Sequence, residues 1–397
     1  MKRLFAVFCV VALIFTFVGC DKGNTESDAS KKPVENNFVY NTDFDGDYFT
    51  LRNGFSNAYN KLKDGKDITI AFLGGSITYG IGTSDLSRSF RVLVENWIEE
   101  NYKVNVTGIN AAIPSAASAH GAYCVDTDVL PKNPDIIFIE YAINDKYASS
   151  KYNNDDFSVH METIVRKIRT IKPDCDIAFL YTTDSWVSVN TPLFEQAEVH
   201  EKVAEHYGVT TINIGYGLRK SKGLIKGTST PADEGRWKQF FTDACHTADN
   251  GNKVYADIIN ECLEAGFKAA KDNIKTNKAM PKQLNDELLM DAKLIKTSTI
   301  SLDNISGWQK STTPWFHFDG YISTDSTDSE FVYTFEGTSF GIIGPVNTEY
   351  SFSVDGGEWT SYTFNTHPQP LVQGLKKGEH TIRIKGASML IAALLVN

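Results

Sequence analysis

The sequence predicts an α/β fold with a central parallel sheet, followed by a smaller all-β domain. Between residues 68 and 270, short apolar runs alternate with amphipathic stretches, as in a three-layer α/β/α, flavodoxin-like sandwich. After residue 285 this pattern gives way to runs of alternating apolar and polar residues separated by turn residues, which is typical of antiparallel strands. A chain of 397 residues is long enough for two folded units and a leader.

Five apolar runs are predicted to form the strands of the parallel sheet. They are residues 68–72, 104–109, 136–141, 177–181 and 210–214. Between these runs, apolar residues recur at helical spacing, so that each stripe can be buried against one face of the sheet. The strands therefore form the middle layer, and helices are expected on both sides of it.

The all-β part is predicted to be a small, jelly-roll-like β-sandwich at residues 286–397. Residues 331–335 and 350–354 alternate between aromatic or apolar and polar side chains, as half-buried strands do. The boundary is placed before residue 286 because residues 273–285 are rich in Lys, Asn, Gln and Pro and lack apolar periodicity. The α/β domain is accordingly assigned to residues 41–285.

The N-terminus has the features of an export signal. Lys2 and Arg3 precede an apolar run that is short for a membrane span and ends in Phe-Val-Gly-Cys20, which resembles a bacterial lipobox. We therefore expect residues 1–19 to be a lipoprotein signal peptide and Cys20 to carry the lipid. Residues 21–37 are rich in Lys, Asp, Ser, Glu and Asn and lack aromatic side chains, so residues 20–40 are expected to be a tether.

This reading predicts an exported protein that is anchored to a bacterial membrane, at the cell surface or in the periplasm. An ordinary cleaved signal and an uncleaved anchor are the alternatives. The formal net charge of -10 disfavours nucleic acid as a partner and direct binding to anionic lipids. Contact with the membrane is thus expected through the lipid anchor alone.

Four cysteines remain outside the leader and the lipobox. They are Cys124, Cys175, Cys245 and Cys262. Because no two cysteines have CxxC spacing, the sequence predicts no metal site. An exported location permits disulfides in any of three pairings, and buried free thiols are an equally good interpretation.

The first candidate for chemistry is Ser76, in a glycine-rich turn directly after the first predicted strand. Ligands gather at the carboxyl ends of parallel strands, so a serine there is exposed to substrate. The glycines do not match a dinucleotide loop, and no Gly-Lys-Ser/Thr sequence follows for a phosphate loop. Thr78 also stands where the GxSxG elbow needs glycine. Ser76 is therefore either a nucleophile or part of a plain tight turn.

Two further segments bring polar side chains to the same edge of the sheet. Asn144 follows a very apolar run, so a central strand delivers an amide that can donate to an oxyanion. Asp243 and His246 lie three residues apart ahead of a predicted helix, where the carboxylate can orient the imidazole. Each feature alone fits a turn, but their order along the chain predicts a serine hydrolase.

With these residues, the chain resembles the SGNH/GDSL hydrolase superfamily over residues 68 to 265. The Gly-Gly-Ser76 turn is similar to the nucleophile block of that family, and Asp243-Ala-Cys-His246 is similar to its DxxH block. The resemblance implies a serine esterase in which Ser76 attacks, His246 is the base and Asp243 orients His246. It also implies that no metal or organic cofactor is needed.

The resemblance implies an oxyanion hole made by the backbone N–H groups of Ser76 and Ser115 and by the side chain of Asn144. Two positions depart from the family pattern, because Ser115 and Ala142 stand where the family has glycine. Serine keeps the backbone N–H. If the position of Ser115 needs a positive φ, however, serine is strained there relative to glycine.

Arg236 and Trp237 are predicted to line a polar, sugar-sized cleft just before Asp243, unless Trp237 is packed as a hydrophobic plug. The aromatic residues of the C-terminal domain either stack on sugars or fill its core. They include Trp308, Trp315, Phe316, Tyr321, Trp359 and Tyr362. Resemblance to exported carbohydrate esterases predicts an acylated carbohydrate as substrate and the removal of acetyl groups from it.

Three other functions are compatible with the same residues. A lysophospholipase or thioesterase would use the same nucleophile on longer acyl chains. An O-acetyltransferase would pass the acyl group to a sugar in preference to water. A surface lipoprotein that only binds glycans would retain the fold without catalysis, and the departures at Ser115 and Ala142 favour it.

Overall fold

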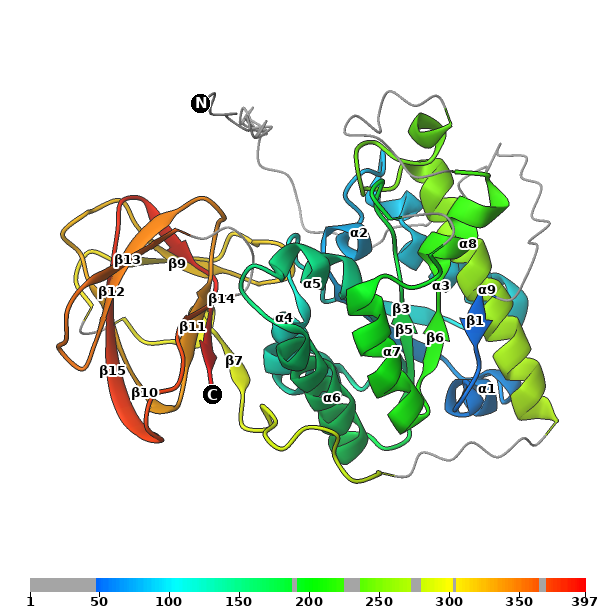
Figure 1. Cartoon of the computed structure of the whole chain (residues 1–397), viewed down its shortest axis with the longest axis horizontal. Coiled ribbons are helices and arrows are strands. Elements are labelled where there is room, and N and C mark those ends of the chain that lie inside the picture. Colours follow the sequence, from blue (N-terminus) through cyan, green and yellow to red (C-terminus); the bar gives the residue numbers. More distant parts are fainter. Residues whose placement is uncertain (1–47, 188–190, 225–235, 273–279, 303–304, 364–368) are drawn as a thin grey trace, which may run out of the picture. The chain divides into compact units, whose positions relative to one another are not determined.

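The computed structural model describes residues 48–187, 191–224, 236–272, 280–302, 305–363 and 369–397 (Figure 1). The described residues belong to one compact unit. The expected signal peptide, the lipid anchor at Cys20 and the tether lie outside the described residues. Within the part of the chain that is described, no helix combines the length and the apolar character needed to cross a membrane.

The α/β part is built around a six-stranded sheet of order β1-β6-β5-β4-β2-β3. Its strands are β1 (Phe49–Thr50), β2 (Ile68–Gly74), β3 (Val106–Asn110), β4 (Ile136–Glu140), β5 (Asp176–Leu180) and β6 (Thr210–Ile212). Strands β2 to β6 pair in parallel, and each lies within two residues of its predicted bounds. The predicted parallel sheet is thus confirmed. The short strand β1, which pairs antiparallel with β6 at the edge, was not predicted.

Helices cover both faces of this sheet (Figure 1). They are α1 (Ser56–Lys63), α2 (Ser76–Tyr79), α3 (Phe90–Tyr102), α4 (Ser118–Cys124), α5 (Ala142–Ala148), α6 (Asn154–Ile171), α7 (Glu195–Tyr207), α8 (Ile214–Ser221) and α9 (Asp249–Lys271). Ala71 and Leu73 of β2 are buried in one cluster with residues of α4, α6 and α7. Ile70 and Phe72 are buried with α1, α3 and α9. Successive strand residues point to opposite faces, which produces the predicted three layers.

The C-terminal part consists of antiparallel strands, as predicted. They are β7 (Lys293–Lys296), β8 (Gln309–Ser311), β9 (Tyr321–Thr324), β10 (Phe331–Gly337), β11 (Phe340–Ile343), β12 (Glu349–Val354), β13 (Thr360–Thr363), β14 (Gln369–Val372), β15 (Gly378–Lys385), β16 (Met389–Ile391) and β17 (Ala393–Val396). They form sheets of order β10-β15-β12-β13, β14-β11-β17-β7 and β16-β9-β8. Aromatic residues of alternating strand positions, such as Phe331 and Phe335, fill the core between them.

The C-terminal strands also pack on the α/β part. Leu294 and Phe318 belong to the same buried cluster as residues of α4 and α6. The hydroxyl groups of Tyr123 and Ser339 lie 3.0 Å apart across this contact. The boundary between residues 285 and 286 stays a prediction, and it falls between the end of α9 and the start of β7.

The four cysteines are all free thiols in the structure. Cys124, Cys175 and Cys262 are buried, and Cys245 is partly exposed. Of the two interpretations that the sequence left open, the structure therefore has free thiols in place of disulfides.

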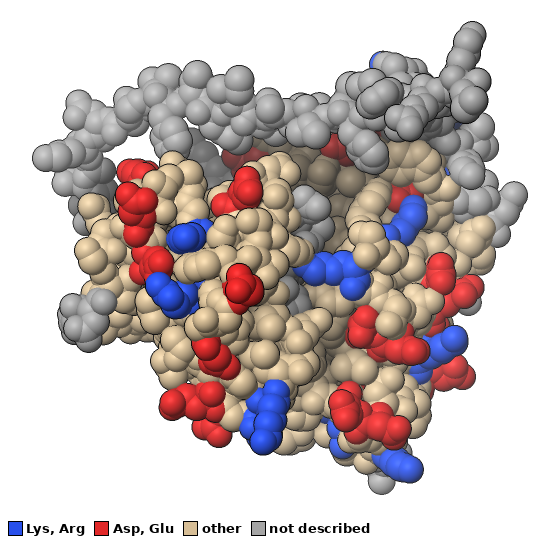
Figure 2. Space-filling model, turned by 60° about the vertical axis from the view of Figure 1, so that its left-hand side comes forward, with Lys and Arg blue, Asp and Glu red and all other residues tan. Residues whose placement is uncertain are grey.

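Charged side chains of both signs are interspersed on the face shown in Figure 2. The whole sequence has a formal net charge of -10.

Candidate active site

Ser76 is the first residue of α2, at the turn where β2 ends. Two glycines precede it because neighbouring groups leave no room for side chains. A Cβ atom at Gly75 would lie 1.8 Å from Nδ2 of Asn144, and one at Gly74 would lie 2.3 Å from Oγ1 of Thr78. The turn therefore places Ser76 at the carboxyl edge of the sheet, with the Asn144 amide against the preceding Gly75.

Ser76, His246 and Asp243 form one chain of hydrogen bonds. The Nε2 atom of His246 lies 2.8 Å from Oγ of Ser76. The Nδ1 atom of the same ring lies 2.6 Å from Oδ2 of Asp243. A carboxylate can only accept, so Nδ1 carries the proton and Nε2 is free to accept the serine proton. Residues far apart in the sequence are thus brought together in the geometry of an acyl-transfer triad.

The loop between Phe241 and α9 fixes the orientation of Asp243. The Oδ1 atom of Asp243 accepts the backbone N–H groups of Cys245 and His246 at 2.9 and 2.8 Å. Partial burial disfavours the ionised carboxylate, but the bond from the His246 side chain and these backbone bonds outweigh it and lower the pKa of Asp243. Asp243 therefore stays negatively charged beside the imidazole.

The Asn144 side chain lies at the start of α5, one residue ahead of the buried Asp145. Its Nδ2 atom donates to the carbonyl of Ala116 at 2.6 Å. An amide nitrogen carries two hydrogens, so the second can donate to a group bound above Ser76. This bond to Ala116 also joins α5 to the segment that contains Ser115.

Ser115 adopts a φ of 64°, in the left-handed region that favours glycine. The segment that leads to it runs along the end of β2, since the Ile113 N–H donates to the Gly74 carbonyl at 3.1 Å. The position therefore has the positive φ that a family glycine adopts without strain. Serine keeps this backbone conformation and its N–H group.

Glu140, the last residue of β4, is a buried acid that the sequence did not single out. Its carboxylate accepts the hydroxyl groups of Thr78 at 2.9 Å and Thr182 at 2.8 Å, and also a backbone hydrogen bond from Gly75. Burial raises the pKa of Glu140 to about 7, although these hydrogen bonds oppose the shift. Glu140 thus stabilises the Ser76 turn through hydrogen bonds to residues on either side of Ser76. This role could not be predicted from the sequence, because Glu140 is a single polar residue within an apolar run.

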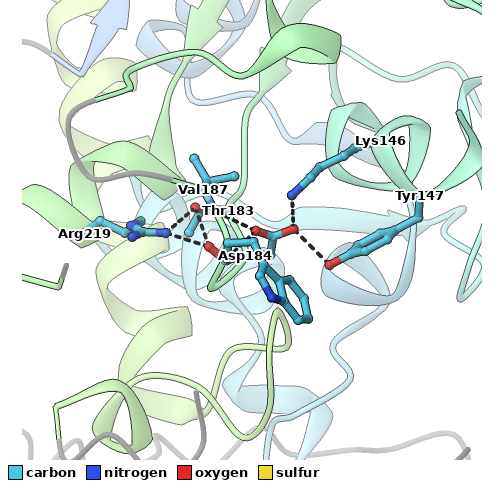
Figure 3. A network of polar contacts seen from close by, with 7 residues as sticks. Lys146, Tyr147, Thr183, Asp184, Val187 and Arg219 are labelled. Carbon is cyan, nitrogen blue, oxygen red and sulfur yellow. Dashed lines mark hydrogen bonds and ion pairs between the residues drawn. The ribbon is translucent and has the colours of Figure 1, made fainter. Parts of the chain in front are cut away.

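A second buried acid, Asp184, lies in the loop after β5 (Figure 3). Its Oδ2 atom accepts Lys146 Nζ at 2.5 Å and the Tyr147 hydroxyl at 2.9 Å, and both donors come from α5. Its main-chain carbonyl accepts the buried Arg219 guanidinium at 2.6 Å. The next residue, Ser185, donates its N–H to the carbonyl of Ala244 at 2.8 Å, so this loop is tied to the His246 loop.

The structure corrects the expectation for Trp237. Its side chain is 1% exposed, so it cannot line a cleft and contact substrate. The indole stacks on Phe241, and Nε1 donates to the main-chain carbonyl of Asp243 at 2.6 Å. Trp237 is therefore packed in the interior of the protein, as in the alternative interpretation of the sequence. Arg236 is exposed, and its guanidinium lies 3.4 Å from the carbonyl of Lys222. A role for Arg236 in substrate binding stays a prediction.

Asp243, Cys245 and His246 each bring one possible metal ligand within 4.8 Å of the others. Both His246 nitrogens are already used by Asp243 and Ser76. Burial and the nearby Asp243 also raise the pKa of the Cys245 thiol well above its usual value. The two hydrogen bonds of His246 place its imidazole for proton transfer with Ser76.

Comparison with known proteins agrees with this geometry. Residues 72–254 match the model of the GDSL-like lipase/acylhydrolase family. No protein of curated function matches the sequence. Two crystal structures of a two-domain esterase active on acetylated mannans, one co-crystallised with mannopentaose, are similar in fold, each with a TM-score of 0.67. Their sequences are 17% and 18% identical to this chain. Each match covers 88% of this chain and 98% of the esterase chain.

The family match covers the nucleophile turn, Asn144 and the DxxH block, and the structural match extends over both parts of the chain. At this level of identity the structural match shows a shared fold. The family match identifies residues 72–254 as a GDSL-like lipase/acylhydrolase domain of the SGNH/GDSL superfamily, which is the ester hydrolase part of the chain.

Proposed function

We propose that this protein is a serine esterase that removes acetyl groups from a polysaccharide or oligosaccharide. The observation that carries the mechanism is the hydrogen-bond chain from Ser76 through His246 to Asp243. Two observations support the proposed substrate. They are the exposed aromatic side chains on segments that contact the catalytic residues, and the similarity in fold to an esterase active on acetylated mannans.

In the first half of the proposed reaction, Oγ of Ser76 attacks the ester carbonyl carbon and gives its proton to Nε2 of His246. The carbonyl electron pair moves onto oxygen. The Asn144 amide and the backbone N–H groups of Ser76 and Ser115 are the donors proposed to stabilise this oxyanion. When the tetrahedral intermediate collapses, the bond to the sugar oxygen breaks, and His246 returns the proton to that oxygen. An acetyl group remains on Ser76.

In the second half, water attacks the acetyl-enzyme while His246 takes one of its protons. Collapse of the second intermediate breaks the bond between the acetyl carbon and Oγ, and His246 returns the proton to Ser76. Acetate leaves, and the resting state is restored. Asp243 remains ionised throughout and stabilises the imidazolium that forms in each half.

Three exposed aromatic side chains favour a sugar as the substrate. Tyr147, Trp186 and Phe316 are 46%, 44% and 36% exposed. Phe316, from the C-terminal part, makes an edge-to-face contact with Tyr79, the last residue of the helix that Ser76 begins. Aromatic faces with an apolar body suit the C–H faces of a sugar ring. An acyl-chain tunnel would bury such rings.

The direct experiment measures acetate release from a panel of O-acetylated glycans, beside p-nitrophenyl esters of increasing chain length. We expect release from at least one glycan, activity that falls beyond short acyl chains, and loss of both activities in Ser76→Ala. Flat or rising activity with chain length would favour a lysophospholipase or thioesterase. Acetyl transfer to an added sugar in preference to water would favour an acetyltransferase.

We also propose that the protein is exported and is anchored to the membrane through a lipid on Cys20. The support is the charged and apolar leader that ends in the lipobox-like sequence. Cys20→Ala should move the protein from the membrane fraction to the soluble fraction. An unchanged distribution would contradict the anchor.

A further inference from the structure

We propose that Trp186 and Tyr147 form an aromatic subsite for the sugar ring that bears the acetyl group, held in place by Asp184. This inference rests on the proposed carbohydrate substrate. It names the side chains that would distinguish an acetylated sugar from a simple acetyl ester.

Both aromatic residues belong to segments that hold the candidate catalytic groups. Tyr147 lies on α5, three residues after Asn144. Trp186 directly follows Ser185, whose N–H donates to the Ala244 carbonyl between Asp243 and His246 at 2.8 Å. A ring held by these segments stays close to the position where the ester carbonyl is attacked.

One buried carboxylate anchors both aromatic residues. Oδ1 of Asp184 accepts the backbone N–H groups of Trp186 and Val187, each at 2.9 Å. Oδ2 accepts the Tyr147 hydroxyl at 2.9 Å and Lys146 Nζ at 2.5 Å. Figure 3 shows Lys146 and Tyr147 converging on the Asp184 carboxylate from the same helix. The Asp184 side chain is completely buried, so these are charge-assisted bonds in a water-poor setting.

The Tyr147 hydroxyl remains a donor to Asp184 at neutral pH. Burial, the Asp184 charge and the neighbouring Cys245 all raise the pKa of this hydroxyl. The negative charge of Asp243 acts in the same direction. The bond that orients the ring therefore does not weaken through ionisation of the tyrosine.

The two rings are nevertheless exposed. Trp186 is 44% exposed and Tyr147 is 46% exposed, although both are tethered to a buried group. Tyr147 is held by its own hydroxyl group, and Trp186 is held through its backbone N–H. A tyrosine ring that is already ordered loses little entropy when a ligand stacks on it, which favours a binding role. Lys146 adds further N–H donors beside Tyr147 for sugar hydroxyl groups.

The test compares kcat/KM for an acetylated oligosaccharide with kcat/KM for p-nitrophenyl acetate, measured on the full chain. We expect Trp186→Ala and Tyr147→Ala each to lower the ratio of the two constants by about tenfold, mainly through a higher KM for the oligosaccharide. Trp186→Phe, which keeps an aromatic face, should restore most of the ratio. Ile171→Ala is the matched control, because Ile171 is 55% exposed at the end of α6 and outside the site.

Asp184→Asn tests the anchor. An amide offers one acceptor oxygen in place of two, so it cannot accept all four bonds, and the same ratio should fall. Because this buried substitution can also impair folding, the two exposed alanine variants decide the question. Wild-type ratios in Trp186→Ala and Tyr147→Ala would overturn the subsite while the proposed function stands. If the wild-type protein hydrolyses p-nitrophenyl acetate but releases no acetate from any glycan, both proposals fail.

Discussion

Replacing Glu140 by glutamine should change how the stability of the protein depends on pH. Glu140 is completely buried below the nucleophile turn, and its pKa rises from 4.5 to about 7 because burial disfavours the charged carboxylate. Below pH 4.5 the acid is protonated in both the folded and the unfolded chain. As the pH rises toward 7, the unfolded chain loses this proton first, so the folded state loses stability.

The size of this effect follows from the shift in the pKa of Glu140. A rise of the pKa from 4.5 to about 7, at about 1.4 kcal/mol per unit, lowers the free energy of unfolding by about 3 kcal/mol between acidic and neutral pH. Glutamine cannot ionise, so Glu140→Gln should lose this part of the pH dependence. Its amide can still accept from Thr78 or Thr182, although one hydroxyl must turn to accept from the new NH₂ group.

The assay is chemical denaturation at a series of pH values from 4 to 8. Relative to wild type, Glu140→Gln should become more stable as the pH rises, by about 3 kcal/mol across the series. Glu349→Gln, at an exposed position of β12, controls for the removal of one carboxylate. If wild type and Glu140→Gln lose or gain stability in parallel over this range, the raised pKa of Glu140 is refuted.

Two further substitutions test the arrangement around Ser76. Asn144→Ala should lower kcat by about 10²- to 10³-fold with a small change in KM, as expected for the loss of one oxyanion donor; a wild-type kcat would remove Asn144 from the oxyanion hole. Gly75→Ala should abolish turnover, because its Cβ would meet Nδ2 of Asn144 at 1.8 Å, and near-normal esterase kinetics would contradict this packing.

The sheet could be predicted from the sequence because its central strands are buried on both faces. The apolar run of β4 (Ile136–Glu140) is an example, since every residue in it is buried. Strand β1 could not be predicted, because two residues at the edge of a sheet carry no periodicity. The family resemblance pointed to Ser115 as a position where φ could be positive, and the structure has a φ of 64° there. The apolar periodicity of the sequence gives no information about this angle.

The supporting residues of the site were harder to predict than Ser76, Asp243 and His246. The candidate triad lies at the ends of predicted elements and has a recognisable order. Glu140 and Asp184 act through partners from other strands and helices, and such partners become neighbours only when the sheet order is known. The wrong expectation for Trp237 has the same origin. An aromatic residue beside a catalytic loop can face the substrate or support the loop from within, and local sequence does not distinguish the two.

The most direct test of the proposed mechanism is mass spectrometry of the protein after reaction with a serine-directed fluorophosphonate. The hydrogen-bond chain from Asp243 through His246 activates one hydroxyl, so we expect a single adduct on the peptide that contains Ser76. Labelling should disappear in Ser76→Ala and slow strongly in His246→Ala. An unlabelled wild-type protein that nevertheless hydrolyses p-nitrophenyl acetate, or an adduct at another serine, would contradict Ser76 as the nucleophile.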